Sequence, residues 1–212
     1  NRVLAMGEED WRVHTVGFPA IDLISEGNYA TPKEIIKKLE LDLSKPIILF
    51  TQHSVTTEFN DASTQIIPSL NAMVELANDG VQVICTYPNN DAGGGAIISE
   101  LEKLDSKNIF GIQVHRSLGR YLYHGVLALA KNESHQIACV GNSSSGIKET
   151  PVFGCPTVNI GSRQKGKVIP NNVLNVQWKE KDILSKINIF LNKKTYRSKL
   201  LISNPYNEKI SA

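Results

Sequence analysis

Short apolar runs of strand length recur along the chain, and segments with the spacing of amphipathic helices separate them. Most of the runs are continuously apolar, which is typical of strands that are buried on both faces of a parallel sheet. The predicted strands cover residues 13–18, 47–51, 81–87, 109–114, 137–141, 157–160 and 173–176.

Apolar side chains three and four positions apart predict helices between these strands, within residues 66–77, 97–104, 118–129 and 183–191. Pro68 must lie near the first turn of its helix or bend it, because proline has no amide hydrogen. The alternation favours a Rossmann-like three-layer α/β domain, with helices on both faces of the sheet. We assign residues 1–197 to this domain and expect a loop and the start of a further helix in 198–212.

Composition argues against several other classes of protein. The chain has 212 residues, of which 41% are hydrophobic and 21% charged, so it can bury a full core. A formal net charge of +2, with both signs evenly spread, argues against nucleic acid as the main partner. No apolar run approaches the ~18 residues of a membrane span. We therefore expect a soluble cytoplasmic protein without membrane contact.

The three cysteines, Cys85, Cys139 and Cys155, are odd in number and lie in or just before predicted strands. This placement is typical of small buried residues in a reducing cytosol. Their spacing fits no zinc site, and we expect neither a metal nor a cofactor. The chain begins at Asn1, and the apolar residues that follow resemble the tail of a helix without an N-cap, so we expect a piece of a longer protein.

The strongest candidate for chemistry follows the predicted strand 137–141. Ser143, Ser144 and Ser145 come directly after this strand and open a predicted helix. Free amide groups at a helix start, serine hydroxyls and the helix dipole together suit phosphate. Glu149, about one turn further on, is suited to accept hydrogen bonds from a ribose diol. An ordinary helix cap with a surface glutamate is the alternative, but three serines exceed what a cap needs.

A second candidate is the Gly-flanked basic loop 161–167. It nearly matches the phosphate loop of ATPases, but Val168 replaces the Ser or Thr that holds magnesium, and Pro170 ends rather than opens a helix. An ATPase is therefore excluded. Arg163 in this loop still suits a diphosphate, because its planar fork can hold two oxygens. A solvated basic loop without a ligand is an equally good interpretation.

Two further loops contain candidate functional residues, His53 and Asp91. His53, just past strand 47–51, can act as an acid, a base or a phosphate donor near neutral pH, although a hydrogen-bonded loop histidine is equally plausible. We interpret the other histidines as structural or exposed: His14, His115, His124 and His135. Asp91 is predicted to cap a helix, and the three glycines after it would let a ligand approach. No G-x-G-x-x-G follows a strand, which argues against nicotinamide and flavin cofactors.

In this order, the loops resemble the UDP-N-acetylglucosamine 2-epimerase family, and its hydrolysing branch in particular. The resemblance covers about residues 2–207 and matches the C-terminal, nucleotide-binding lobe of a GT-B-like enzyme with two Rossmann-like lobes. Non-hydrolysing members are expected to have Arg-Arg-Glu-Asn after the histidine and Asp-Ser-Gly-Gly in the serine loop, and neither is present. The matching segments are Met6-Gly-Glu, Gly17-Phe-Pro, Gln52-His-Ser-Val-Thr-Thr, Tyr87-Pro-Asn-Asn-Asp-Ala-Gly, Gly141-Asn-Ser-Ser-Ser-Gly, Gly154-Cys-Pro and Asn159-Ile-Gly-Ser-Arg-Gln-Lys-Gly.

The resemblance implies a role in binding UDP for eight residues. Ser143 and Ser144 would hold the diphosphate, with Arg163 near it, and Glu149 would hold the uridine ribose. The remaining implied roles concern the phosphates, the cleft and the uracil: His53 contacts the diphosphate and assists its departure, Gly17 lets backbone approach the phosphates, Asn89 lines the cleft, and Leu118 forms an apolar wall of the uracil site in 111–118.

The implied reaction eliminates UDP from UDP-N-acetylglucosamine or a related UDP-N-acetylhexosamine, after which water adds to give the free 2-epimeric sugar. Such products feed sialic-acid-like sugars, including legionaminic acid. The resemblance assigns the base to acidic residues of the N-terminal lobe, which is absent from this sequence. We therefore expect this chain to bind UDP without turning over a sugar nucleotide, and its parent could form a homo-oligomer.

Two other functions remain open from the sequence. A GT-B glycosyltransferase also binds a nucleotide diphosphate through its C-terminal lobe, and it would need an acceptor for the sugar. A standalone sugar-nucleotide sensor would need no second lobe. A further ~150 residues of alternating strand and helix upstream would favour the epimerase.

Overall fold

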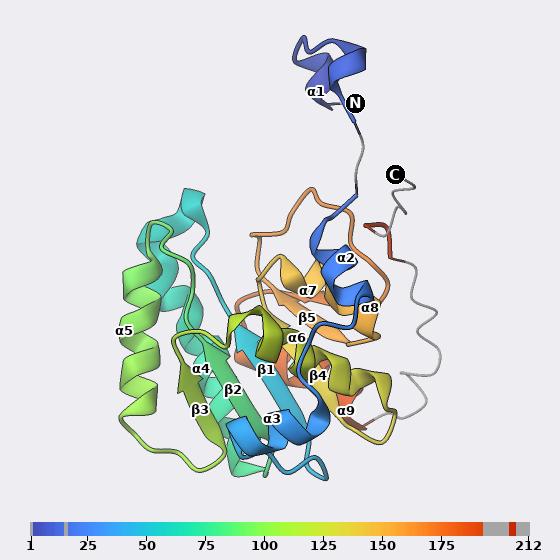
Figure 1. Cartoon of the computed structure of the whole chain (residues 1–212). Helices are drawn as coiled ribbons and strands as arrows, with labels where there is room; N and C mark the ends of the chain where they lie inside the picture. The colour runs from blue at the N-terminus through green and yellow to red at the C-terminus, as the bar shows by residue number, and fades with distance from the viewer. Residues whose placement is uncertain (1, 15–16, 193–203, 207–212) are drawn as a thin grey trace.

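The computed structural model describes residues 2–14, 17–192 and 204–206, and its centre is a six-stranded parallel sheet (Figure 1). The strand order is β3-β2-β1-β4-β5-β6, and every neighbouring pair is parallel. The strands are β1 (Ile47–Thr51), β2 (Gln82–Thr86), β3 (Ile112–His115), β4 (Ile137–Gly141), β5 (Thr157–Ile160) and β6 (Val173–Val176). Four of them, β1, β4, β5 and β6, have the predicted bounds, because their mainly apolar segments end at or just before polar or glycine residues.

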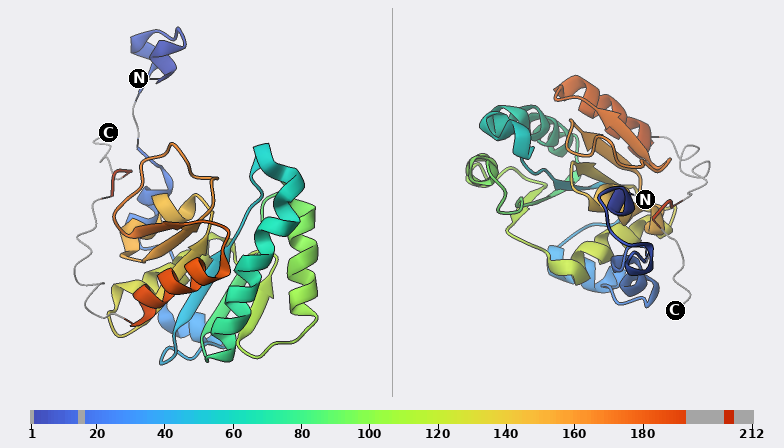
Figure 2. Two further views of the ribbon diagram at one scale, coloured as in Figure 1. Left: turned by 180° about the vertical axis from the view of Figure 1, so that it is seen from behind. Right: turned by 90° about the horizontal axis from the view of Figure 1, so that it is seen from above.

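Helices cover both faces of this sheet, which confirms the predicted three layers (Figure 2). On one face lie α4 (Ala62–Asn78), α5 (Gly94–Asp105) and α9 (Glu180–Asn192); on the other lie α3 (Pro32–Leu39) and α6 (Gly119–Ala128). Alternate residues of β1 serve the two cores: Ile48 and Phe50 point to the first face, Ile47 and Leu49 to the second.

The helices differ from the prediction in two details. Pro68 lies inside α4, beyond its first turn, where it removes one helix hydrogen bond. Helix α3 was not predicted, although the sequence contains its start signal: Thr31 and Glu34 form a reciprocal capping box. None of the described helices has the length and apolar character needed to cross a membrane.

The predicted strand at 13–18 is wrong within the residues that the structure describes. Residues 13–14 and 17–18 form no strand, and α2 (Ala20–Ser25) follows directly. Gly17 adopts a left-handed φ of +66°, and Pro19 has no amide hydrogen to donate, so both interrupt extended pairing. Before this segment, α1 (Arg2–Ala5) and the short helix η1 (Asp10–Arg12) lie away from the sheet (Figure 1).

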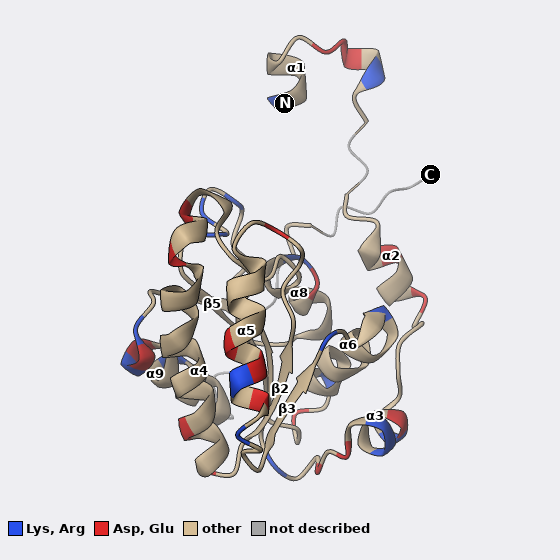
Figure 3. Ribbon diagram, turned by 90° about the vertical axis from the view of Figure 1, so that its left-hand side faces the viewer, with Lys and Arg blue, Asp and Glu red and all other residues tan. Residues whose placement is uncertain are grey.

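The burial of the cysteines and the mixture of both charges on the helices agree with what the sequence predicts. Cys85, Cys139 and Cys155 are all buried, and burial raises the pKa of the first two to about 12. Helices α3, α5 and α9 each carry both signs of charge (Figure 3). The predicted loop and helix in 198–212 lie outside the described residues, apart from a turn at 204–206.

The carboxyl ends of β1 and β4 are in close contact at Gly141. Gly141 pairs with Thr51 and has a φ of +127°, a backbone conformation that residues with a side chain rarely adopt. A Cβ atom on Gly141 would lie 1.9 Å from the carbonyl oxygen of Thr51. Only glycine therefore allows these two strand ends to approach each other.

We expect Gly141→Ala to lower the free energy of unfolding by more than about 3 kcal/mol, or to prevent folding, because it adds both steric overlap and backbone strain. Gly95→Ala is the matched control, since a Cβ atom at Gly95 on α5 meets nothing within 4 Å. Urea unfolding of the two variants measures the difference. A Gly141→Ala protein within about 0.5 kcal/mol of the wild type would contradict the close approach.

Candidate functional site

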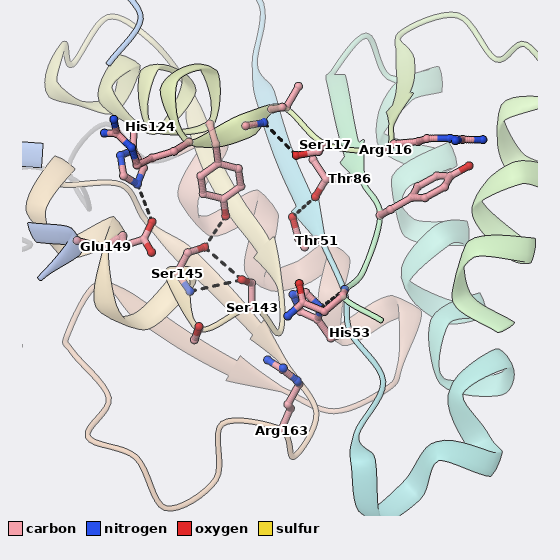
Figure 4. Close-up of a pocket in the computed structure, with 18 residues that line it drawn as sticks. Thr51, His53, Thr86, Arg116, Ser117, His124, Ser143, Ser145, Glu149 and Arg163 are labelled. Carbon is pink, nitrogen blue, oxygen red and sulfur yellow. Dashed lines mark hydrogen bonds and ion pairs between the residues drawn. The ribbon is translucent and has the colours of Figure 1, made fainter. Parts of the chain in front are cut away.

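A cavity of about 410 Å³, here called the first cavity, opens at the carboxyl ends of the strands (Figure 4). Ligands of open parallel sheets bind at this edge. Seven of the eight predicted site residues line it: His53, Asn89, Leu118, Ser143, Ser144, Glu149 and Arg163. Gly17 is not among the lining residues, whereas Ala20 in α2 is, so the role of Gly17 stays a prediction.

Asn142 connects three of the loops around the first cavity. The His53 amide donates a hydrogen bond to Asn142 Oδ1 over 2.7 Å, and Asn142 Nδ2 donates to the His53 carbonyl over 2.8 Å. The Asn142 carbonyl accepts hydrogen bonds from Arg163 over 3.3 Å and from Gln164 over 2.7 Å. Asn142 is completely buried. The prediction gave it no role, because one asparagine beside three serines has no distinguishing signal.

His53 is held as a neutral hydrogen-bond donor. Its Nδ1 accepts a hydrogen bond from the Asn89 amide over 3.0 Å, so the neutral ring carries its proton on Nε2. Burial, and secondarily the Arg163 guanidinium, lower the pKa of His53 to about 4, while the Asp91 carboxylate acts in the opposite direction. At neutral pH this side chain therefore offers an N–H group and no positive charge to a ligand.

The serine segment folds into two one-turn helices, α7 (Ser145–Lys148) and α8 (Thr150–Phe153). Glu149 lies at their junction, and not one turn into a single helix as predicted. The helix restarts because Pro151, near the beginning of α8, cannot continue the hydrogen-bond pattern of α7. This break places Glu149 on the wall of the first cavity.

Helix α6 fixes two side chains of the serine segment. The Tyr123 hydroxyl shares a 2.5 Å hydrogen bond with Ser145, whose own hydroxyl donates to Ser143 over 3.3 Å. The neighbouring His124 donates from Nε2 to Glu149 Oε2 over 2.9 Å. Figure 4 shows both links on the same side of the cavity.

The interpretation of His124 as a residue without a site role is therefore incomplete. It is buried, as expected of a structural histidine, but it lines the first cavity and orients Glu149. Periodicity placed it on a helix, yet nothing in the sequence pairs it with a residue 25 positions away.

Arg163 reaches the first cavity from the basic loop, with a carboxylate beside it. Its guanidinium lies 3.4 Å from Asp91 Oδ2. The prediction that Asp91 caps α5 is wrong: the N-cap is Gly93, with a φ of +84°, and only the carbonyl of Asp91 bonds to the helix start. The glycines delay the helix by two residues, which frees the carboxylate for Arg163.

The opposite end of the first cavity is built differently. Residues 116–120, after β3, line it, and the Ser117 hydroxyl accepts a hydrogen bond from the Gly119 amide over 3.0 Å. Leu118 is buried and supplies an apolar surface, while Thr51 and Thr86 share a hydrogen bond beside it. This end therefore offers a ligand both an apolar surface and hydroxyl groups.

We expect Asn142→Ala to lower the free energy of unfolding by about 2–4 kcal/mol, because it leaves the buried backbone of His53 without two partners. Asn132→Ala is the control, since Asn132 caps an exposed turn through Ser134. Urea unfolding measures both. Equal small losses in the two variants would show that Asn142 does not hold the loops together.

The pH dependence of the free energy of unfolding should be determined in part by His53. Its pKa is about 4 in the folded protein and about 6.5 in an unfolded chain, so only the unfolded chain gains a proton between these values. The contribution of His53 to the free energy of unfolding is therefore fully present above pH 6.5. It falls by up to about 3 kcal/mol as the pH is lowered to 4. His53→Gln should flatten this slope, while His14→Gln, at an exposed position, should keep it. Unfolding at a series of pH values tests this, and identical slopes in all three proteins would refute it.

A family model described as UDP-N-acetylglucosamine 2-epimerase matches residues 1–212. The GDP/UDP-N,N'-diacetylbacillosamine 2-epimerase (hydrolyzing) of Campylobacter jejuni is 33% identical over 181 residues, which cover 85% of this chain and 45% of that protein. The corresponding UDP-N,N'-diacetylbacillosamine 2-epimerase (hydrolyzing) of Legionella pneumophila is 29% identical over 208 residues, or 98% of this chain and 51% of the relative.

Among solved structures, the UDP-GlcNAc 2-epimerase of Methanocaldococcus jannaschii in complex with UDP-GlcNAc and UDP has a TM-score of 0.64 at 16% identity. The match covers 97% of this chain and 54% of that structure, which confirms the predicted fold of one lobe of a GT-B-like protein. This chain spans about half the length of the curated relatives that it matches. The family match extends over the whole chain, which belongs to the UDP-N-acetylglucosamine 2-epimerase family.

Proposed function

We propose that the first cavity binds the UDP part of a UDP-N-acetylhexosamine, and that this chain is the nucleotide-binding lobe of a hydrolysing 2-epimerase. The observation that carries the proposal is the convergence of three loops on one cavity. Those loops bring together a neutral histidine, a serine segment at a helix start, an arginine and a glutamate. Their chemistry matches a phosphate chain with a ribose attached.

The geometry supports one order of the ligand along the first cavity. Oε2 of Glu149 is bonded to His124, so Oε1 is left to accept hydrogen bonds from the ribose hydroxyls. Ser143, Ser144 and Arg163 supply donors and positive charge for the diphosphate. Leu118 and its neighbours then take the uracil.

The hydrolysing branch is supported by the relatives and by two sequence segments. The relatives of Campylobacter jejuni and Legionella pneumophila are both named as hydrolysing enzymes. In this chain, Ser-Val-Thr-Thr follows His53, and the serine segment reads Gly-Asn-Ser-Ser-Ser-Gly. Both segments depart from the patterns expected of non-hydrolysing epimerases.

In the proposed reaction a base removes the proton from C2 of the sugar, a double bond forms between C1 and C2, and UDP leaves C1 with the electron pair. Water then adds across the double bond, with hydroxide at C1 and a proton at C2 from the opposite face. The residues of this chain would bind and stabilise the departing diphosphate, with the His53 N–H as one donor. The free 2-epimeric amino sugar would serve the synthesis of sialic-acid-like sugars such as legionaminic acid.

The experiment that tests this function is a calorimetric titration of the chain with UDP, with ADP and NAD as controls. We expect UDP alone to bind. Glu149 would hold the ribose of any of the three nucleotides, so the selection falls to residues 116–120, which would take the smaller uracil base. Preference for ADP, or absence of UDP binding, would refute the assignment.

Glu149→Ala should weaken UDP binding by about 1–3 kcal/mol, or roughly 5- to 150-fold, since the ribose loses a charged acceptor. Glu133→Ala removes the same side chain from an exposed loop and serves as the control. The same titration measures both variants, after circular dichroism has shown that each is folded. Unchanged affinity in Glu149→Ala would exclude the ribose role.

A further inference from the structure

A second cavity, of about 540 Å³, adjoins the first. Ser144 and Arg163 line both, so the two cavities meet at groups that suit phosphate. The other walls of the second cavity come from residues 55–58, after His53, and from the basic loop, which contributes Ser162, Lys165 and Lys167. None of these other lining residues belongs to the first cavity.

The shared residues determine which part of a ligand reaches the second cavity. Glu149 and Leu118 line only the first cavity, so a ribose and a base bound there lie on the far side of Ser144 and Arg163. A diphosphate that starts at this ribose ends at the shared residues. Whatever is attached to the second phosphate then extends into the second cavity.

Two hydrogen bonds hold Glu58 on the wall of the second cavity. Glu58 interrupts the short helix η2 (Thr56–Asp61) with φ −130° and ψ 27°. Gln65 donates a hydrogen bond to its Oε2 over 2.7 Å, and Ser162 donates to its Oε1 over 2.9 Å. Each carboxylate oxygen therefore keeps capacity to accept one more hydrogen bond.

The charges of the second cavity make this carboxylate distinctive. Among the described residues that line the cavity, Glu58 is the one acidic side chain, while Arg163, Lys165 and Lys167 are basic and the threonines and serines are neutral. The basic groups can donate to phosphate and to carbonyl oxygens. A sugar, however, also carries O–H and N–H donors, and the strongest acceptor available to them is Glu58.

We propose that the second cavity holds the glycosyl group of the substrate and that Glu58 accepts a hydrogen bond from one of its O–H or N–H groups. Glu58 is then a specificity-determining residue that distinguishes a UDP-sugar from UDP itself. This inference rests on the proposed function, because it assumes that the nucleotide occupies the first cavity.

The test compares the affinities for UDP, UDP-N-acetylglucosamine and UDP-glucose by calorimetry, in the wild type and in Glu58→Gln. We expect the wild type to bind UDP-N-acetylglucosamine at least about 5-fold more tightly than UDP. Glu58→Gln should lower the affinity for UDP-N-acetylglucosamine about 10-fold and leave that for UDP within about 2-fold. An equal loss for UDP-glucose would assign the hydrogen bond to a hydroxyl, and a loss confined to UDP-N-acetylglucosamine would assign it to the acetamido N–H.

The control is Asp61→Asn, which removes an exposed carboxylate from the same short helix without touching either cavity. It should leave all three affinities unchanged. Ser162→Ala keeps the carboxylate of Glu58 and removes one of its two donors, and it should cost about 3-fold in the affinity for UDP-N-acetylglucosamine. This variant answers the question even if Glu58→Gln does not fold.

Two results would overturn the inference while leaving the proposed function intact. The first is equal wild-type affinity for UDP and UDP-N-acetylglucosamine. The second is a Glu58→Gln protein that loses affinity equally for both, which would show that Glu58 only supports the basic loop. Absence of UDP binding in the wild type would instead refute the proposed function, and this inference with it.

Discussion

The close approach of β1 and β4 at their carboxyl ends determines the geometry of the whole site. Gly141 allows the two backbones to come together, and Asn142 then continues the pairing beyond the sheet by bonding to the backbone of His53 with its side chain. Arg163 donates a hydrogen bond to the backbone carbonyl of the same asparagine. Donors that come from separate loops are thus fixed relative to one another before any ligand arrives, which is the condition for strong electrostatic stabilisation.

Much of this arrangement follows from local sequence patterns. The strands from β4 to β6 have the predicted bounds because each is a short, mainly apolar segment that ends at a glycine or just before a glycine or polar residue. In a parallel sheet the carboxyl ends all meet at one edge. Polar residues that follow different strands, such as His53 and Ser143, could therefore be expected in one place without any knowledge of the loops between them.

The contacts between individual side chains could not be predicted in this way. Hydrogen bonds such as His124 to Glu149 depend on rotamers and on separations of a few tenths of an ångström, which no periodicity records. The pairing of Asp91 with Arg163 spans 72 positions and required the helix to start two residues late. Local preference also misled at 13–18, because the left-handed backbone of Gly17 and the missing amide hydrogen of Pro19 oppose an extended, paired strand.

The ion pair with Asp91 stabilises the positive charge of Arg163 at the first cavity. At 3.4 Å the contact is long for an ion pair, and the guanidinium also donates to the Asn142 carbonyl, so its position does not depend on Asp91 alone. Desolvation of the guanidinium is offset by a carboxylate that is itself partly exposed. A diphosphate bound as proposed would share or replace Asp91 as the partner of Arg163, and the neutral His53 would add a donor without adding a second charge to desolvate.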